Sequence, residues 1–396
     1  MRLPSASART PEISPGARRQ ILAFTAAVGF YWASLYVFVP LLAPEADRLG
    51  ATVGGVGAVL AAYGLAELLF RVPLGIWTDR LRRRLPLMVG ALLLSAAAAV
   101  GMGLSSTPLA LGALRGLSGV AASAWVPITL LAMDLFPDDR IAWALGLVNF
   151  SSGVGEMAAL LLGGLLAQFA GYPAAFIAGG VLALLGAAVV LAFVREAPRQ
   201  LSAPSPSWGR LRAIVRHPRV LAASAMGVIL QYVVTATLFG FIPLIAVQRM
   251  HAGGAALGVL SLVLVGPSTA LPLVGARLAE RKGPSAATAL GLGIAGVGTA
   301  LVPLAGSIVA LGAAGAVISA GIGLATPVLM GVAVQSVPKG ERGSAMGLYQ
   351  ALYAVGTFAG PSLAGLIGQH FGPTAMFASI AAVSLAGAAI AASVLR

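Results

Sequence analysis

Residues 86–104 read PLMVGALLLSAAAAVGMGL and contain no charged side chain. A helix needs about 20 apolar residues to cross the hydrocarbon core of a bilayer. A strand of a membrane barrel would instead alternate apolar and polar residues over about ten positions, whereas this segment and Ile308–Leu324 are apolar on every face. Both segments therefore predict transmembrane α-helices.

Comparable apolar segments recur along the whole chain. Its 396 residues are 59% hydrophobic and 9% charged, whereas a soluble domain carries about 25% charged residues. This composition excludes a water-soluble globule and predicts an all-α membrane protein with twelve transmembrane helices. The helices are expected near residues 20–43, 52–77, 86–104, 107–133, 141–168, 172–194, 220–247, 254–279, 285–304, 307–334, 342–369 and 373–394.

The basic residues predict how these helices are oriented. All 25 Lys and Arg residues fall in the even-numbered loops or the two tails, except Arg48, Arg71, Arg115 and Arg249. The positive-inside rule places those loops and both termini in the cytoplasm. We therefore expect a multi-pass protein of the inner (plasma) membrane. Topology and contact with the lipid bilayer account for the net charge of +13, so no nucleic-acid partner is expected.

The chain contains an internal duplication. Segment 195–219, rich in Pro, Ser and Arg, separates two halves. We predict a cytoplasmic tail (1–19), a six-helix bundle (20–194), a cytoplasmic linker (195–219) and a second, pseudo-symmetric six-helix bundle (220–396). At an offset of 201 residues, the fifth predicted helix and its flanks match the eleventh: Pro137, Gly155, Gly164, Gly171 and Phe176 correspond to Pro338, Gly356, Gly365, Gly372 and Phe377.

The loop after the second predicted helix reads GIWTDRLRRR over residues 75–84. It resembles motif A of the major facilitator superfamily, Gly-x-x-x-Asp-Arg-x-Gly-Arg-Arg, with Arg82 where glycine is usual. The resemblance implies a gate in which Asp79 faces the N-terminus of the eleventh helix, where the helix dipole favours negative charge. It also implies that Arg80 pairs with Asp134, and we assign Arg71 to the same gating group.

Two further segments resemble this superfamily. Residues 115–122, RGLSGVAA, are similar to its motif B, and residues 36–41, YVFVPL, are similar to the start of the twelve-helix drug and proton antiporters. Antiporters of the superfamily usually carry a Gly-Pro pair in the fifth helix. Here that pair is Gly360–Pro361 in the eleventh helix, and Ala159–Leu160 stands in the fifth. The resemblance implies a proton-coupled exporter, with this departure from the pattern.

Three ionisable side chains are predicted near the middle of the membrane: Arg115, Glu67 and Glu156. An Arg at a helix centre costs about 2.5–3.5 kcal/mol on insertion scales, so intramembrane charges are usually functional. The matching positions of the second half are uncharged: Ala316, Ser268 and Thr357. Burial raises the pKa of a carboxyl group and a neighbouring arginine lowers it, so a local rearrangement can change its protonation. We therefore predict that these three residues couple proton binding to transport. Alternatively, Glu67 and Arg71 only neutralise each other, four residues apart on one helix face.

The first, fourth, seventh and tenth predicted helices are expected to line a central cavity. Its aromatic and weakly polar lining suits an amphipathic organic molecule. The substrate-binding candidates are Tyr31, Trp32, Tyr36, Trp125, Gln231, Tyr232, Thr235, Ser319 and Gln335.

The sequence contains no phosphate-binding loop of the Gly-x-x-x-x-Gly-Lys-Ser/Thr type, and its three histidines fall in different loops. We therefore expect no enzyme activity, no cofactor and no metal, and transport driven by a proton gradient. The preferred interpretation is a monomeric antiporter that exports a small molecule by alternating access. A proton-linked uptake symporter of an organic anion, with Arg115 binding its carboxylate, and a lipid-handling or sensory member of the same fold remain alternatives.

Overall fold

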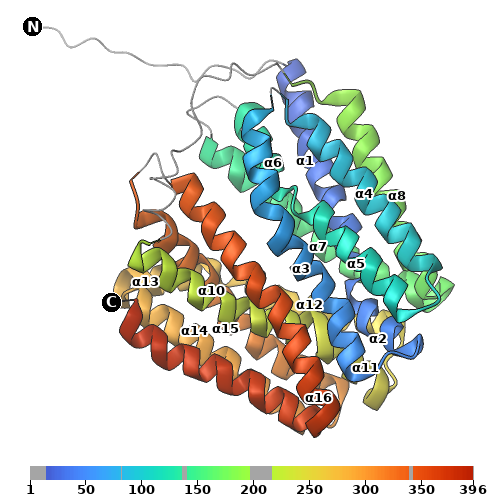
Figure 1. The fold of residues 1–396 in the computed structure, drawn as a ribbon, viewed down its shortest axis with the longest axis vertical. Helices are drawn as coiled ribbons and strands as arrows, with labels where there is room; N and C mark the ends of the chain where they lie inside the picture. The colour runs from blue at the N-terminus through green and yellow to red at the C-terminus, as the bar shows by residue number, and fades with distance from the viewer. Residues whose placement is uncertain (1–14, 82, 136–140, 197–215, 339–341, 396) are drawn as a thin grey trace, which may run out of the picture.

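The computed structural model describes residues 15–81, 83–135, 141–196, 216–338 and 342–395. All regular secondary structure in these ranges is helical (Figure 1). The first half contains α1 (Pro15–Tyr36), α2 (Val39–Arg48), α3 (Val53–Arg80), α4 (Leu85–Leu104), α5 (Pro108–Ala122), α6 (Trp125–Leu135), α7 (Ile141–Ala170) and α8 (Tyr172–Phe193). The second half contains α10 (Pro218–Ala236), η2 (Thr237–Phe241), α11 (Ile242–Met250), α12 (Gly254–Ala270), α13 (Pro272–Lys282), α14 (Pro284–Leu301), η3 (Val302–Leu304), α15 (Ile308–Gln335) and α16 (Arg342–Val394).

These helices form twelve membrane crossings. Eleven continuous apolar segments in the described ranges are long enough to span a bilayer, and the last, Ser344–Val394, is 51 residues long. At about 1.5 Å per residue, this segment is more than twice as long as the roughly 30 Å core of a bilayer. Gly372 interrupts it with a positive φ of 83°, so it is two successive crossing helices. The predicted all-α fold with twelve transmembrane helices is confirmed.

Four crossing helices are broken on the N-terminal side of a proline. Proline lacks the N–H that would bond to the carbonyl four residues earlier, and its ring clashes with that carbonyl. Accordingly, α1 gives way to α2 before Pro40, and α5 gives way to α6 before Pro127. In the second half, α10 passes through the π-helix η2 before Pro243, and α12 ends before Pro272.

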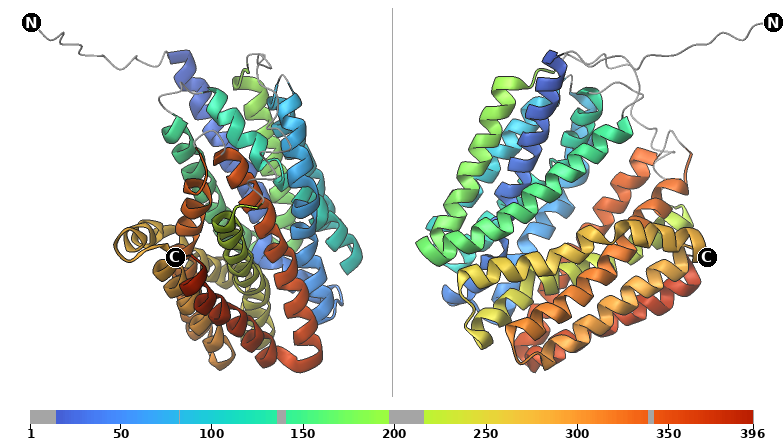
Figure 2. Two further views of the ribbon diagram at one scale, coloured as in Figure 1. Left: turned by 60° about the vertical axis from the view of Figure 1, so that its left-hand side comes forward. Right: turned by 180° about the vertical axis from the view of Figure 1, so that it is seen from behind.

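The crossings form two bundles. In the first half, α1 packs against α7 and α8, and α4 packs against α5 and α8. In the second half, α14 packs against α15 and α16, and α10 packs against the same two helices. Figures 1 and 2 show the first half (blue to green) and the second half (yellow to red) side by side. Most of the predicted linker, residues 197–215, lies outside the described residues.

The two ends of the molecule differ in charge. The end that we call the basic end carries the exposed side chains of Arg18, Arg19, Arg83, Arg195, Arg216, Arg219, Arg281 and Lys282. At the opposite end, α2 packs on α11, and Gln248 Nε2 donates to Asp47 Oδ1 at 3.0 Å. The bundles meet at this opposite end and diverge toward the basic end (Figure 1).

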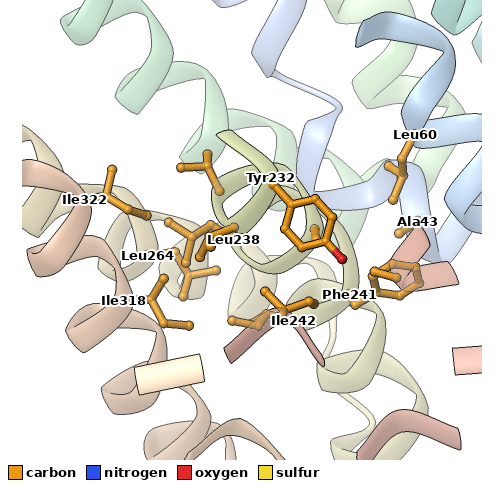
Figure 3. Packing of buried hydrophobic residues seen from close by; sticks show 14 of the residues in the cluster. Ala43, Leu60, Tyr232, Leu238, Phe241, Ile242, Leu264, Ile318 and Ile322 are labelled. Carbon is orange, nitrogen blue, oxygen red and sulfur yellow. The ribbon is translucent and has the colours of Figure 1, made fainter. Parts of the chain in front are cut away.

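An apolar core joins the halves near the break between α10 and α11. Figure 3 shows Phe241 and Ile242 in a buried cluster that also contains Leu60 of α3 and Ala43 of α2. Lipid chains are as apolar as these side chains, so close packing and interhelical hydrogen bonds, not the hydrophobic effect, drive helix association in a bilayer. This packing fixes the positions of the helices that surround the central cavity.

Candidate functional site

A central cavity lies between the two halves. Its empty space is about 780 Å³, a volume that includes the open space at its mouth. The first half supplies walls from α1, α2, α3, α5 and α6, and the second half supplies walls from α10, η2 and α16. A ligand in this cavity would contact both bundles.

Glu67 and Arg71, one helical turn apart on α3, form a buried ion pair in the wall of this cavity. Arg71 Nη2 donates to Glu67 Oε1 at 2.5 Å, and the Arg71 and Glu67 side chains are 4% and 6% exposed. The second terminal nitrogen, Arg71 Nη1, donates to the Tyr353 hydroxyl at 3.0 Å and to the Gln350 carbonyl oxygen at 3.4 Å. Since Tyr353 and Gln350 belong to α16, the pair connects the first half to the second.

Arg115, on α5, lies in the same cavity wall without a carboxylate partner. Its Nη1 donates to Ser118 Oγ at 3.3 Å, and its guanidinium carbon lies 4.2 Å from the ring centre of Tyr63 and 5.8 Å from that of Phe38. No Asp or Glu among the described residues approaches it within the 4.0 Å of an ion pair. Its direct contacts are therefore with aromatic faces and a hydroxyl group.

Aromatic side chains form another part of the cavity lining. The ring centre of Trp32 lies 5.1 Å from that of Trp125 and 5.4 Å from that of Tyr36. The Tyr36 ring, in turn, meets Phe239 of η2 edge to face at 5.6 Å. These spacings are typical of favourable aromatic pairs, and they join the helices of one half to the broken helix of the other.

Glu156 on α7 is not among the residues that line this cavity. Its side chain is partly exposed, and within the described ranges it forms no ion pair. The neighbouring Gly155 packs closely on α1, where an added Cβ would lie 3.0 Å from Gly29 Cα. The structure thus brings Glu67, Arg71 and Arg115 together in one cavity and leaves Glu156 outside its lining.

The substrate-binding candidates divide into two groups. Five of them line the cavity: Trp32, Tyr36, Trp125, Gln231 and Thr235. The other four are not among the lining residues. The Tyr31 hydroxyl donates to the Ala121 carbonyl oxygen at 2.9 Å, and Tyr232 belongs to the buried core. Ser319 Oγ accepts the Ser268 N–H, and Gln335 is exposed at the end of α15.

Sequence reasoning assigned no site role to nine of the lining residues, among them Tyr63, Phe239, Tyr353 and Thr357. Thr357 carried a signal, because it occupies the position equivalent to Glu156 in the duplication.

The predicted gate is only partly described. Helix α3 ends at Arg80, but the side chains of Asp79, Arg80 and Arg342 lie outside the described residues, so the predicted pairing of Arg80 with Asp134 stays a prediction. Asp134 forms an ion pair with Arg84, whose Nη1 donates to Asp134 Oδ2 at 2.6 Å.

The same region contains a helix cap that the sequence did not suggest. The Glu196 carboxylate accepts the backbone N–H groups of Arg84 and Leu85 at 2.7 and 2.8 Å. These are first-turn groups of α4, which have no partner within their own helix. The cap therefore fixes the end of α8 to the start of α4 at the basic end.

Comparison with known proteins identifies the family. The model of the Major Facilitator Superfamily matches residues 22–310 and 229–396. The inner membrane transport protein YajR of Escherichia coli (strain K12) is 28% identical over 181 residues, which are 46% of this chain and 39% of that protein. A chloramphenicol resistance protein of Streptomyces lividans is 29% identical over 253 residues, which are 63% of this chain and 64% of that protein. The matches thus span less than two thirds of either relative.

Among solved structures, an inward-facing, unoccupied bacterial homolog of the human lysosomal transporter Spinster has the same fold. It superimposes with a TM-score of 0.77 at 16% identity, over 96% of each chain. With a family match over most of the chain, twelve crossings and a cavity between two bundles, the chain belongs to the Major Facilitator Superfamily and is a multi-pass membrane transporter.

Proposed function

We propose that the protein is a proton-coupled antiporter of the inner membrane that exports an amphipathic organic molecule by alternating access. The observation that supports this most is the hydrogen-bonded chain from Glu67 through Arg71 to Tyr353. It connects a carboxylate in the cavity of one bundle directly to the other bundle. A proton on that carboxylate would therefore change a contact on which the relative position of the halves depends.

The coupling step follows from the charges of this chain of contacts. Ionised Glu67 holds Arg71 in the position from which Arg71 donates to Tyr353 and Gln350. Protonation of Glu67 removes the charge that attracts the guanidinium, so Arg71 is no longer held and the contact with α16 weakens. Because the two states of the interface bind the proton with different affinity, the proton and the conformation are thermodynamically linked.

The proposed direction of transport rests on the orientation of the protein in the membrane and on the names of two relatives. By the positive-inside rule, the basic end and both termini face the cytoplasm, so the bundles diverge on the cytoplasmic side. A cavity between bundles arranged in this way would accept a molecule from the cytoplasm. One relative is named a chloramphenicol resistance protein and another an inner membrane transport protein, which favours export across the inner membrane.

Everted membrane vesicles that contain the protein test this proposal. With the lumen acidified and a pH-sensitive dye present, an antiporter exchanges lumenal protons for compound added outside, so the lumen becomes more alkaline. We expect this response from chloramphenicol or from aromatic acids. The variants Glu67→Gln and Glu156→Gln should abolish it, whereas Glu280→Gln, which changes an exposed carboxylate on α13, should not.

Other outcomes separate the alternatives. Alkalinisation only when the compound is preloaded into the lumen would indicate an uptake symporter. Compound-dependent proton flux that persists unchanged in both glutamine variants would contradict the assigned coupling. If water-soluble compounds cause no flux while lipids exchange between leaflets, the lipid-handling alternative would replace the proposed function.

A further inference from the structure

The walls of the central cavity carry hydrogen-bond donors without acceptors. Four buried polar atoms there have no partner within the described residues: Trp32 Nε1, Arg71 Nε, Arg115 Nε and Thr357 Oγ1. The indole and guanidinium nitrogens can only donate a hydrogen bond, and the threonine hydroxyl can donate or accept. A buried donor without an acceptor is unfavourable, so the unpaired groups indicate a ligand rich in acceptors.

The charges of the cavity indicate the same kind of ligand. Glu67 is the one carboxylate among the described lining residues, and Arg71 already occupies one of its oxygens at 2.5 Å. Arg115 therefore leaves one positive charge without an ionic partner in the wall. A buried charge is costly unless it is paired, and an anion bound in the cavity would pair it.

We propose that the transported molecule is an aromatic or otherwise apolar organic anion. Its acid group would bind Arg115, with Trp32 Nε1 and Thr357 Oγ1 as further donors, and its apolar body would lie against Trp125 and Phe239. This substrate class rests on the proposed function, because it takes the cavity as the transport site. An amphipathic amine of the same shape would be repelled by the positive charge of Arg115, so the proposal excludes amines as substrates.

Binding of three probes with one aromatic body tests this proposal. The probes are 1-naphthylacetate, its uncharged methyl ester and 1-naphthylethylammonium, and binding to the purified protein is measured by equilibrium dialysis at neutral pH without any gradient. We expect the anion to bind more tightly than the ester and the ammonium ion to bind least. Arg115→Gln should lower the affinity for the anion by about 10- to 100-fold, as for hydrogen bonds to charged groups, and leave that for the ester unchanged.

A second variant keeps the test independent of any folding defect in Arg115→Gln. Thr357→Val preserves the shape and charge of the cavity and removes one hydroxyl, so it should weaken binding of the anion selectively, by a smaller factor. Equal or tighter binding of the ammonium ion, or no binding of the anion, would overturn the proposal. Because the dialysis uses no pH gradient, its result does not depend on proton coupling. The vesicle assay tests proton coupling separately, so failure of one proposal can be distinguished from failure of the other.

The end opposite the basic end is closed by two contacts that repeat at an offset of 201 residues. Near the end of α7, Gln168 Oε1 accepts the N–H of Ala255 in the first turn of α12, at 3.4 Å. Within α16, just before the interruption at Gly372, Gln369 Oε1 accepts the N–H of Gly54 in the first turn of α3, at 3.1 Å. Each glutamine thus caps a helix of the other half, and the capped groups have no partner within their own helices.

The helix crossings behind these caps repeat in the same way. A Cβ on Gly57 of α3 would lie 3.0 Å from Gly365 Cα of α16, and a Cβ on Gly258 of α12 would lie 3.2 Å from Gly164 Cα of α7. Glycine therefore lets each pair of backbones approach closely enough for the glutamine to reach. From these contacts we infer that Gln168 and Gln369 are a symmetric pair of latches that hold this end closed while the basic end is open.

Distance measurements between spin labels test the latches. Since the chain contains no cysteine, labels can be attached at Ser106→Cys and Gly306→Cys, both exposed at the opposite end. Gln168→Met and Gln369→Met keep the side-chain length and remove the amide oxygen. We expect each single variant to add a population with a longer distance, and the double variant to increase that population further.

The matched control is Gln335→Met, which changes an exposed glutamine on α15 in the same way. It should leave the distance distribution unchanged. A double variant indistinguishable from this control would overturn the inference, and an effect confined to one of the two glutamines would contradict the symmetric pairing.

Discussion

Replacing Glu67 with leucine is expected to lower the free energy of unfolding by about 3–5 kcal/mol, the cost of leaving a buried charge without its partner. Arg71 stays charged and is only 4% exposed, and the Tyr353 hydroxyl and Gln350 carbonyl that it also contacts are uncharged. Unfolding in mixed micelles, followed by tryptophan fluorescence, measures this change. The double variant Glu67→Leu/Arg71→Leu should recover most of the loss, because it removes both charges.

The control for this experiment is another acidic residue with an arginine partner on its own helix. Glu45 pairs with Arg48, whose side chain is 60% exposed, so Glu45→Leu leaves an arginine that water can solvate. Although the Glu45 side chain is itself only 4% exposed, the arginine left behind stays in water, so the cost should be smaller than that of Glu67→Leu. Equal costs for Glu67→Leu and Glu45→Leu would contradict a buried, charged pair at the cavity.

Gly164→Val is expected to prevent the opposite end from closing and to stop transport. A Cβ on Gly164 would lie 2.5 Å from the Gly254 carbonyl oxygen and 2.6 Å from Gly258 Cα, and both are backbone atoms that cannot turn away. Overpacking of this kind costs about 1–3 kcal/mol, which lowers the population of this state by about 5- to 150-fold at 1.4 kcal/mol per factor of ten. Vesicle flux and the spin-label distance at the opposite end measure the effect.

Gly153→Val on the same helix is the matched control, because an added Cβ there meets nothing within 4 Å. It introduces the same side chain into α7 without the clash and should keep both flux and the distance distribution. A Gly164→Val protein that transports as well as this control would show that closure at the opposite end does not need the contact between α7 and α12.

The fold follows from the sequence because membrane crossings require long segments that are apolar on every face, and such segments are visible without any contact information. The breaks in four crossings were not anticipated. Pro40, Pro127, Pro243 and Pro272 barely change the hydropathy of their segments, yet each removes a backbone hydrogen bond. The breaks determine how Trp125 and Phe239, which lie beside them, enter the cavity wall.

The site was partly predictable for a different reason. Glu67, Arg71 and Arg115 stand out because charges are rare within crossings and expensive there, and the structure places all three in one cavity. Neutral lining residues carry no such signal. Consecutive residues point about 100° apart around a helix of 3.6 residues per turn, so Trp32 lines the cavity while Tyr31 is buried against Ala121.

The side-chain contacts at the basic end could not be predicted from the sequence. Segment 80–84 contains four arginines, and a resemblance to a motif cannot tell which of them reaches a given carboxylate. The structure pairs Asp134 with Arg84 and caps α4 with Glu196. Both contacts depend on how the turns between α3 and α4 and after α8 are shaped, which no periodic pattern in the sequence encodes.

The most direct test of the central claim measures the distance between the halves at the basic end as a function of pH. Spin labels at Gly16→Cys and Lys282→Cys, both exposed, report on α1 and α13 in detergent micelles or nanodiscs over about pH 5 to 8. If protonation of Glu67 releases Arg71 from α16, the distance distribution of the otherwise unmodified protein shifts as the pH falls. Glu67→Gln then shows the low-pH distribution at every pH. A distribution independent of pH, or a Glu67→Gln protein that still responds as the unmodified protein does, would contradict the account.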